Sequence, residues 1–113
     1  MTAITLDELL ARRDEIALLD VRTPAEYAGD TGYPCDPRQG HIPGARNVAV
    51  VGLSPEEVRA VVGLPAGAVV VAYCHSGARS ANAIPWLRAA GYEAYNYEGS
   101  WHEWSRREDL PAE

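Results

Sequence analysis

Residues 69–80 read VVVAYCHSGARS and join an expected strand to an expected helix. The run from Val69 to Tyr73 is apolar throughout, which is typical of a strand buried on both faces. A helical pattern follows, reaches Ala90 and ends at a glycine. Cys74 therefore falls at the carboxyl end of a strand, which is where open α/β sheets bind their ligands.

The surroundings of Cys74 favour a reactive thiolate over the alternative, an inert buried cysteine. The loop leads to a helix N-terminus, whose unpaired backbone N–H groups and positive dipole end attract an anion. Gly77 lets the loop curl so that its N–H groups point inward, and Arg79 adds a permanent positive charge. Such surroundings lower the pKa of a thiol and make it a nucleophile. Cys74 and Arg79 are therefore the candidate catalytic residues.

The other polar residues of this loop have lesser expected roles. We expect His75 to donate a hydrogen bond at the rim rather than act as a general base, because adjacent residues of a curled loop point in different directions. Ser76 and Ser80 are expected to give hydroxyl groups to the anion site or to cap the helix. The chain lacks the G-x-S-x-G pattern of a serine hydrolase at this position.

The rest of the chain alternates between helical and strand patterns. Capping boxes predict helices that begin after Thr5 and Ser54 and end near Arg13 and Gly63. Other patterns predict strands at 16–19, 47–51 and 94–97, a helical turn at 24–27 and a long loop at 29–44. Pro85 is expected to kink its helix. Strands separated by helical crossovers predict one α/β domain over residues 1–113, with a mainly parallel sheet.

The composition argues against several classes of protein. A chain of 113 residues is long enough for one compact domain, and a net charge of −6 without a basic cluster argues against nucleic-acid binding. No apolar run is long enough to span a membrane, and the first residues lack the pattern of a secretory signal. Two cysteines make no disulfide framework, so the expected location is the reducing cytoplasm. The histidines and cysteines also lack metal-ligand spacing, and no metal site is expected.

Five segments resemble those of the rhodanese-domain sulfurtransferases and follow in the same order. They are Asp20-Val21-Arg22, Glu26-Tyr27, Gly40-His41-Ile42-Pro43-Gly44-Ala45, the Cys74–Ser80 loop, and Gly99-Ser100-Trp101-His102-Glu103-Trp104. The last segment is similar to one in thiosulfate and mercaptopyruvate sulfurtransferases. The matches extend from residue 20 to residue 104. One such match is weak, whereas five in register are specific.

The resemblance implies a three-layer domain, in which a five-stranded sheet carries helices on both faces. It also implies a ping-pong reaction without a metal or an organic cofactor. Cys74 takes a sulfane sulfur from a small anionic donor such as thiosulfate and becomes a persulfide. It then passes the sulfur to a thiophilic acceptor, which is cyanide, a thiol or a protein. We expect a monomer. The residues expected to bind the substrate are His75, Ser76, Gly77, Ala78, Ser80, Arg22 and Trp101.

Several of these residues have a structural role as an alternative. Arg22 can form a buried ion pair with Asp20 that braces the active-site loop instead of contacting the substrate. Trp101 and Trp104 are spaced for core packing, with a role in the pocket wall as the second interpretation. His41 is expected to fix its loop by hydrogen bonds.

Three other functions remain open from the sequence. The related cysteine phosphatases use a Cys-x5-Arg loop, and this chain has the shorter Cys-x4-Arg, which is tight for a phosphate ester. A regulatory binding module is a second possibility, although such modules often lack the cysteine. The third is a sulfur carrier, which shares the first half-reaction and delivers the persulfide sulfur to a partner protein.

Two further residues are of interest. Cys35, in a proline-rich loop, is a conceivable resolving partner for Cys74. Glu26 stands where tandem-domain thiosulfate enzymes typically carry an arginine that assists the anionic donor. A carboxylate there is expected to oppose thiosulfate and raise its KM, so an arginine at this position should lower the KM.

Overall fold

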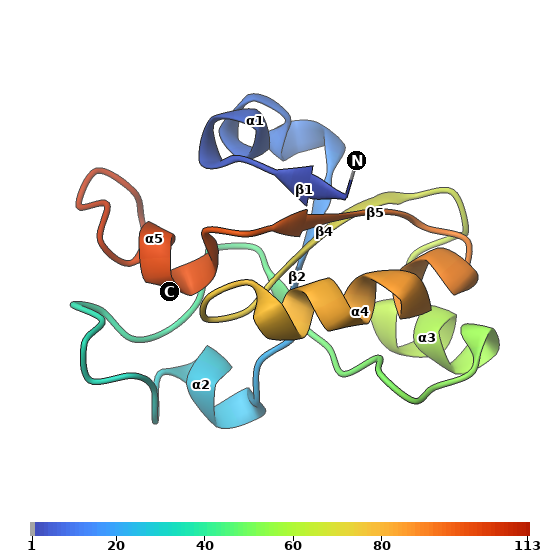
Figure 1. Ribbon diagram of the computed structural model, residues 1–113, viewed down its shortest axis with the longest axis horizontal. Coiled ribbons are helices and arrows are strands. Elements are labelled where there is room, and N and C mark those ends of the chain that lie inside the picture. Colours follow the sequence, from blue (N-terminus) through green and yellow to red (C-terminus); the bar gives the residue numbers. More distant parts are fainter. Residues whose placement is uncertain (1) are drawn as a thin grey trace.

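The computed structural model describes residues 2–113 and contains one five-stranded sheet (Figure 1). Its strands are β1 (Ala3–Ile4), β2 (Ala17–Asp20), β3 (Arg46–Asn47), β4 (Val69–Tyr73) and β5 (Glu93–Tyr97). They lie in the order β1-β5-β4-β2-β3, and every pair in the described sheet is parallel. The predicted α/β class with a mainly parallel sheet is therefore confirmed.

The helices begin where the sequence provides caps. They are α1 (Leu6–Ala11), α2 (Pro24–Ala28), α3 (Pro55–Val62), α4 (Ala78–Ala89) and α5 (Ser100–Trp104), with a short 3₁₀ helix at Arg13–Glu15. The two predicted capping boxes are present at α1 and α3. A third box, in which Thr23 and Glu26 cap α2, was not predicted. Helix α4 continues past Pro85, which lies inside it, as far as Ala89.

The sheet is buried on both faces, as in a three-layer domain. On one face Leu19, Val70 and Ala72 pack with the apolar sides of α3 and α4. On the other face Leu18, Val71 and Tyr73 pack with α1 and with the two tryptophans of α5. Neighbouring residues of β2 and β4 thus point to opposite sides, and this explains why both strands read as continuous apolar runs.

One strand prediction needs correction, and one strand was not predicted. The expected strand at 47–51 is only Arg46–Asn47, because the chain pairs briefly with β2 and then leaves the sheet. Val48 and Val50 remain buried, so their apolar character reflects packing against α3 and α4 rather than strand pairing. Strand β1 was not predicted, because two residues at the sheet edge are too short for a periodic pattern.

The topology places the loop after β4 at the centre of one sheet edge. Strand β4 lies between β5 and β2, so the loop that begins at Cys74 has a neighbouring strand on each side. Figure 1 shows that this loop lies beside α5 and near the long connection between α2 and β3. These two segments form the surroundings of the site.

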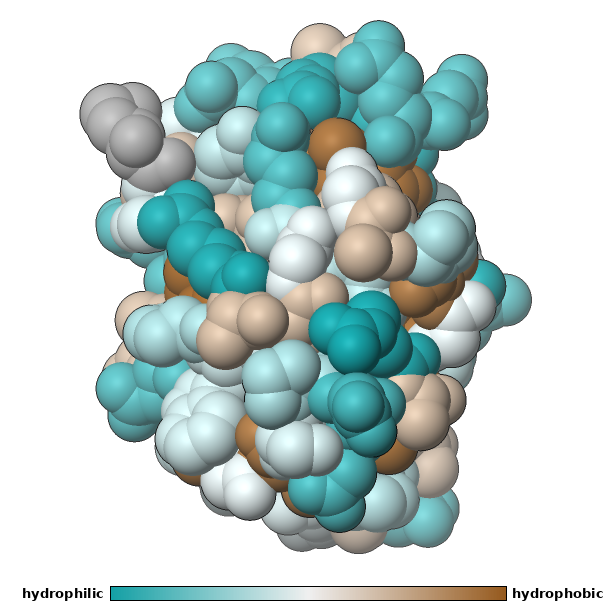
Figure 2. All heavy atoms as spheres, turned by 90° about the vertical axis from the view of Figure 1, so that its right-hand side faces the viewer, coloured by the Kyte–Doolittle hydropathy of each residue, from teal (hydrophilic) through white to brown (hydrophobic). Residues whose placement is uncertain are grey.

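The surface in Figure 2 carries hydrophilic residues interspersed with single hydrophobic ones. The large hydrophobic residues that remain exposed in the described chain come from separate elements, namely Leu10, Tyr33, Val51, Val61 and Trp86. Among the described residues, no helix has both the length and the apolar character needed to cross a bilayer.

Candidate active site

The main chain around Cys74 is fixed by the start of α5. The backbone N–H of Cys74 donates to Ser100 Oγ at 3.1 Å, and the Ser100 hydroxyl donates to the Tyr97 carbonyl at 2.7 Å. In return, the N–H groups of Trp101 and His102 donate to the carbonyls of Cys74 and His75. The nucleophile is therefore held between β4 and α5, and only 1% of Cys74 is exposed.

The Cys74 sulfur accepts hydrogen bonds from its own loop. The Gly77 N–H lies 3.1 Å from Sγ and the Ser80 hydroxyl 3.4 Å. Burial raises the pKa of the thiol, but the Ser80 hydroxyl and the N–H groups of Ser80, Gly77 and Ser76 outweigh it. The pKa of Cys74 therefore lies below its ordinary value. Gly77, whose N–H group is predicted from the sequence to point inward, is one of these donors.

The Ser80 hydroxyl has two acceptors within reach and one proton. Its oxygen lies 3.2 Å from the Gly77 carbonyl and 3.4 Å from Cys74 Sγ. When Cys74 ionises, the sulfur becomes the stronger acceptor and attracts that proton. Ser80 is fully buried, so water does not compete for this bond. The side chain thus stabilises an anion on Cys74 without any large movement.

Gly77 is required by the shape of the loop. Its φ of +96° lies in the left-handed region, and a Cβ at this position would come within 2.8 Å of the Glu98 carbonyl oxygen. Asn96 of β5 donates through Nδ2 to the Gly77 carbonyl at 3.1 Å and holds the peptide from the other side. The N–H of Gly77 is therefore aimed at the sulfur by backbone geometry.

Arg79 lies at the site but makes its ion pair with Glu26. The guanidinium donates to both carboxylate oxygens, at 2.8 and 3.0 Å. The hydrogen bonds from Arg79 hold the pKa of Glu26 at about 2, and those to Glu26 raise the pKa of Arg79. Among the described residues, the donors to Cys74 Sγ are Gly77 and Ser80. The positive charge near the thiolate is thus largely neutralised by Glu26.

This arrangement predicts which side chain controls the ionisation of Cys74. Ser80→Ala removes a hydrogen bond to the thiolate, and we expect the pKa of Cys74 to rise. Arg79→Ala should raise it by less, because Glu26 already neutralises that charge. The measurement is the rate of alkylation of Cys74 against pH in a Cys35→Ser background. A larger shift for Arg79→Ala than for Ser80→Ala would contradict this ranking.

An open pocket of about 340 Å³ lies beside Arg79. It is lined by Thr23, Glu26, Thr31, Gly32, Tyr33, Pro34 and Arg79. A second pocket of about 260 Å³, lined by residues of the 49–51 segment and α4, shares Arg79. Arg79 therefore borders both pockets, and its side chain is 41% exposed. A small anion that enters the first pocket meets the Glu26–Arg79 pair, and one that enters the second meets Arg79.

The loop residues next to Cys74 divide into two groups. His75 is buried, its ring stacks on Tyr33 with centroids 3.6 Å apart, and its Nε2 lies 2.9 Å from Asp36 Oδ2. Ser76 and Ala78 are exposed, and Ser76 contributes to the site through its backbone N–H. The His75 ring is thus engaged by Tyr33 and Asp36, which fits a side chain that is not the general base.

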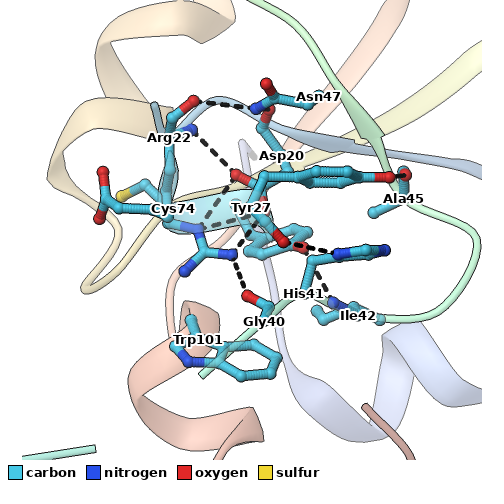
Figure 3. A network of polar contacts seen from close by, with 12 residues as sticks. Asp20, Arg22, Tyr27, Gly40, His41, Ile42, Ala45, Asn47, Cys74 and Trp101 are labelled. Atoms are coloured by element: carbon cyan, nitrogen blue, oxygen red, sulfur yellow. Dashed lines mark hydrogen bonds and ion pairs between the residues drawn. The ribbon is translucent and has the colours of Figure 1, made fainter. Parts of the chain in front are cut away.

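Arg22 lies in a buried network, which Figure 3 shows. It donates to both carboxylate oxygens of Asp20, and also to the Gly40 carbonyl. Its side chain is 1% exposed and lies over the Trp101 ring, 5.3 Å from the centroid. It is absent from the lining of both pockets that border Arg79. For Arg22 we therefore assign the structural alternative, in which it ties the 40–45 segment to β2.

Two aromatic contacts complete this bracing. Trp101 is fully buried and donates from Nε1 to the Arg38 carbonyl at 3.0 Å, so the structure places it in the core. His41 stacks on Tyr27, and its Nδ1 lies 2.8 Å from the Tyr27 carbonyl oxygen. His41 thus fixes its loop as the sequence suggests (Figure 3).

Sequence reasoning missed several residues that shape the site. Ser100 and Asn96 hold the loop backbone, and Asp36 faces His75. The position of Ser100 as the second residue of a matched segment was the available signal, and in the structure its φ of +53° is left-handed. Asp36 lies in a loop with no regular pattern, so only the fold reveals its contact.

Comparison with known proteins agrees with this architecture. The model of the rhodanese-like domain family matches residues 3–107. A structure titled probable thiosulfate sulfurtransferase superposes with a TM-score of 0.83 at 49% identity, over 98% of this chain and 47% of that one. Structures of EanB, at 19% identity and a TM-score of 0.81, share the fold.

Curated relatives are similar over part of their length. The putative thiosulfate sulfurtransferase of Haloferax volcanii is 33% identical, with 95% of this chain matched to 46% of the relative. The sulfur carrier protein TtuD of Thermus thermophilus is 37% identical, over 84% of this chain and 40% of the relative. For the 3-mercaptopyruvate sulfurtransferase of Escherichia coli the identity is 32%, over 95% and 43%. The chain thus spans less than half the length of these relatives. Its sequence and its fold together show that it belongs to the rhodanese-like domain family.

Proposed function

We propose that this chain is a sulfurtransferase that carries a sulfane sulfur on Cys74 as a persulfide. The observation that carries the proposal is the pair of donors on Cys74 Sγ, the Gly77 N–H at 3.1 Å and the Ser80 hydroxyl at 3.4 Å. They lower the pKa of the thiol at the end of the central strand. The names of the relatives, which include thiosulfate and mercaptopyruvate sulfurtransferases, support the same chemistry.

The reaction consists of two displacements at sulfur. The Cys74 thiolate attacks the outer sulfur of thiosulfate, a new S–S bond forms, and sulfite leaves with the electron pair of the old S–S bond. An acceptor such as cyanide then attacks the terminal sulfur of the persulfide, and thiocyanate leaves as the Cys74 thiolate is restored. The persulfide anion formed in the first step and the thiolate restored in the second are stabilised by the same hydrogen-bond donors of the loop.

The first half-reaction can be tested alone. Thiosulfate added to the protein without an acceptor should release about one sulfite per chain in a burst, because the persulfide accumulates when no acceptor removes its sulfur. Cyanide should then release the same amount of thiocyanate. The Cys35→Ser variant should give the same burst, and Cys74→Ala should give none. Release of sulfite by Cys74→Ala would overturn the proposal.

The Glu26–Arg79 ion pair should limit the affinity for an anionic donor. Glu26→Gln removes the carboxylate but keeps the capping box of α2, since glutamine serves equally well at that position. Arg79 is then free to attract thiosulfate, and we expect the KM for thiosulfate to fall by about two- to fivefold. The decrease should be larger at low ionic strength than at high ionic strength.

Glu57→Gln is the matched control for this prediction. Glu57 occupies the equivalent position in the capping box of α3, and its carboxylate serves Ser54. Its substitution should leave the KM unchanged. If Glu26→Gln also leaves the KM unchanged at both salt concentrations, Arg79 does not contribute to donor binding.

A sulfur carrier is the second candidate, supported by the 37% identity to a protein named as one. A carrier shares the first half-reaction and differs in the acceptor, which is a partner protein rather than a small thiophile. Comparison of the second half-reaction with cyanide, glutathione and a persulfide-accepting protein distinguishes the two. The phosphatase alternative is disfavoured by the Cys74–Arg79 spacing, because its Cys-x4-Arg loop is one residue shorter than the Cys-x5-Arg loop of the cysteine phosphatases.

A further inference from the structure

Two loops bring Cys35, Asp36 and His75 together at the edge of the active-site loop. One ligand atom of each, the Cys35 sulfur, an Asp36 carboxylate oxygen and a His75 ring nitrogen, lies within 4.8 Å of the other two. Asp36 and His75 are buried, whereas Cys35 is exposed. No sequence pattern predicts this group, because its members come from two segments that meet only in the fold.

Two buried polar atoms of this group lack a hydrogen bond. Asp36 Oδ2 and His75 Nε2 approach to 2.9 Å, yet neither has a hydrogen-bond partner in the described structure. Their contact is therefore short but not aligned as a hydrogen bond. The Asp36 side chain is 99% buried, since its relative exposure is 1%. Leaving such atoms unpaired costs free energy, so an additional group that binds both would be stabilising.

The other oxygen of Asp36 is already occupied. Arg106 donates to Oδ1 at 2.8 Å and also to the Cys35 carbonyl at 2.9 Å. These bonds fix the orientation of the carboxylate and of the Cys35 main chain, as outer partners do around metal ligands. They leave Oδ2 directed toward His75. The Tyr33 ring, stacked on His75, fixes the imidazole in the same way.

We propose that Cys35, Asp36 and His75 bind a divalent cation of the zinc class. Thiolate, carboxylate and imidazole are the three side-chain types that zinc uses, and all three are available here. In a tetrahedral site such ligand atoms lie about 3.4 to 3.6 Å from one another, so the 2.9 Å contact opens slightly and the sulfur moves inward. Because Cys35 is exposed, its thiol can make that movement.

The local charges are compatible with a bound dication. Thiolate and carboxylate supply two negative charges, and neutral imidazole supplies a nitrogen lone pair. Water can fill the fourth position; His102, whose Nδ1 lies 3.8 Å from Asp36 Oδ1, is 52% exposed and lies outside the group of three. Arg106 adds one positive charge, which weakens the site; its side chain is 36% exposed, so solvent screens part of that charge. The alternative to a bound cation is a direct ion pair between His75 and Asp36.

The test is metal binding by the full chain in a Cys74→Ala background, which removes the other thiol. Zinc is titrated calorimetrically at neutral pH, and cobalt is used as a spectroscopic probe of the thiolate. We expect one ion per chain and a cobalt spectrum with a thiolate-to-metal charge-transfer band and tetrahedral features. Circular dichroism of each variant checks that it is folded.

Three variants decide the outcome. Cys35→Ser and Asp36→Asn should each weaken zinc binding by at least about 10-fold, and Cys35→Ser should abolish the charge-transfer band. Asp30→Asn, an exposed acid of the same connection, should leave the affinity unchanged. Absence of zinc binding, or zinc binding that Cys35→Ser does not weaken, would overturn the proposal and favour the His75–Asp36 ion pair. Since Cys35 is exposed and Cys74 is absent from the assay, the result is independent of the proposed sulfur transfer.

Discussion

Cys74→Ala should abolish thiosulfate-dependent thiocyanate formation, with a loss of at least about 1,000-fold. The reason is that both displacements pass through the Cys74 sulfur, and an alanine has no atom that can hold the transferred sulfur. The fold should be unaffected, because the smaller side chain leaves the main-chain bonds of Cys74 to Ser100 and Trp101 in place. The measurement is the initial rate with thiosulfate and cyanide, with circular dichroism as a check of folding.

Cys35→Ser is the matched control for this experiment. It removes the only other cysteine of the chain and should retain most of the activity when a chelator is present. The comparison therefore separates a general loss of thiols from loss of the nucleophile. Activity in Cys74→Ala above a few per cent of the unmodified protein would show that sulfur transfer does not require Cys74.

Gly77→Ala should produce the second large effect, a loss of about 100-fold in kcat/KM. The added Cβ would lie 2.8 Å from the Glu98 carbonyl oxygen, and the φ of +96° is unfavourable for alanine. The loop must shift, and the Gly77 N–H then no longer points at the Cys74 sulfur. We also expect the pKa of Cys74 to rise and the free energy of unfolding to fall by about 1 to 3 kcal/mol.

Gly67→Ala distinguishes the local effect from a general loss of stability. Gly67 has a similar φ of +91°, but a Cβ there meets no atom of the described residues within 4 Å, and the residue lies in the turn before β4. This variant should lose about 1 kcal/mol of stability and keep its kcat/KM. Equal losses of activity in the two variants would mean that the Gly77 N–H does not contribute to the reaction.

The parts of the fold that were predicted correctly depend on local patterns. The apolar runs at β2 and β4 report burial on both faces, and the capping boxes of α1 and α3 report helix starts. The location of Cys74 at a strand end followed from the same patterns. Strand β3 was placed too far along the chain because Val48 and Val50 are buried without being paired.

The side-chain contacts between distant segments could not be predicted in the same way. Glu26 and Arg79 lie on different helices, and their ion pair depends on how α2 sits beside α4. The contact of Asp36 with His75 depends on the path of an irregular loop. Such pairs leave no periodic signal in the sequence. This is why Arg79 was expected beside the sulfur, whereas the structure pairs it with a carboxylate.

The most direct test of the persulfide mechanism is intact-protein mass spectrometry after a pulse of thiosulfate, followed by peptide mapping. The mechanism predicts that the protein gains the mass of one sulfur atom, that the gain maps to Cys74, and that cyanide removes it. Cys35→Ser should show the same gain and Cys74→Ala none. A protein that turns over thiosulfate without any added sulfur, or with the sulfur on Cys35, would contradict it.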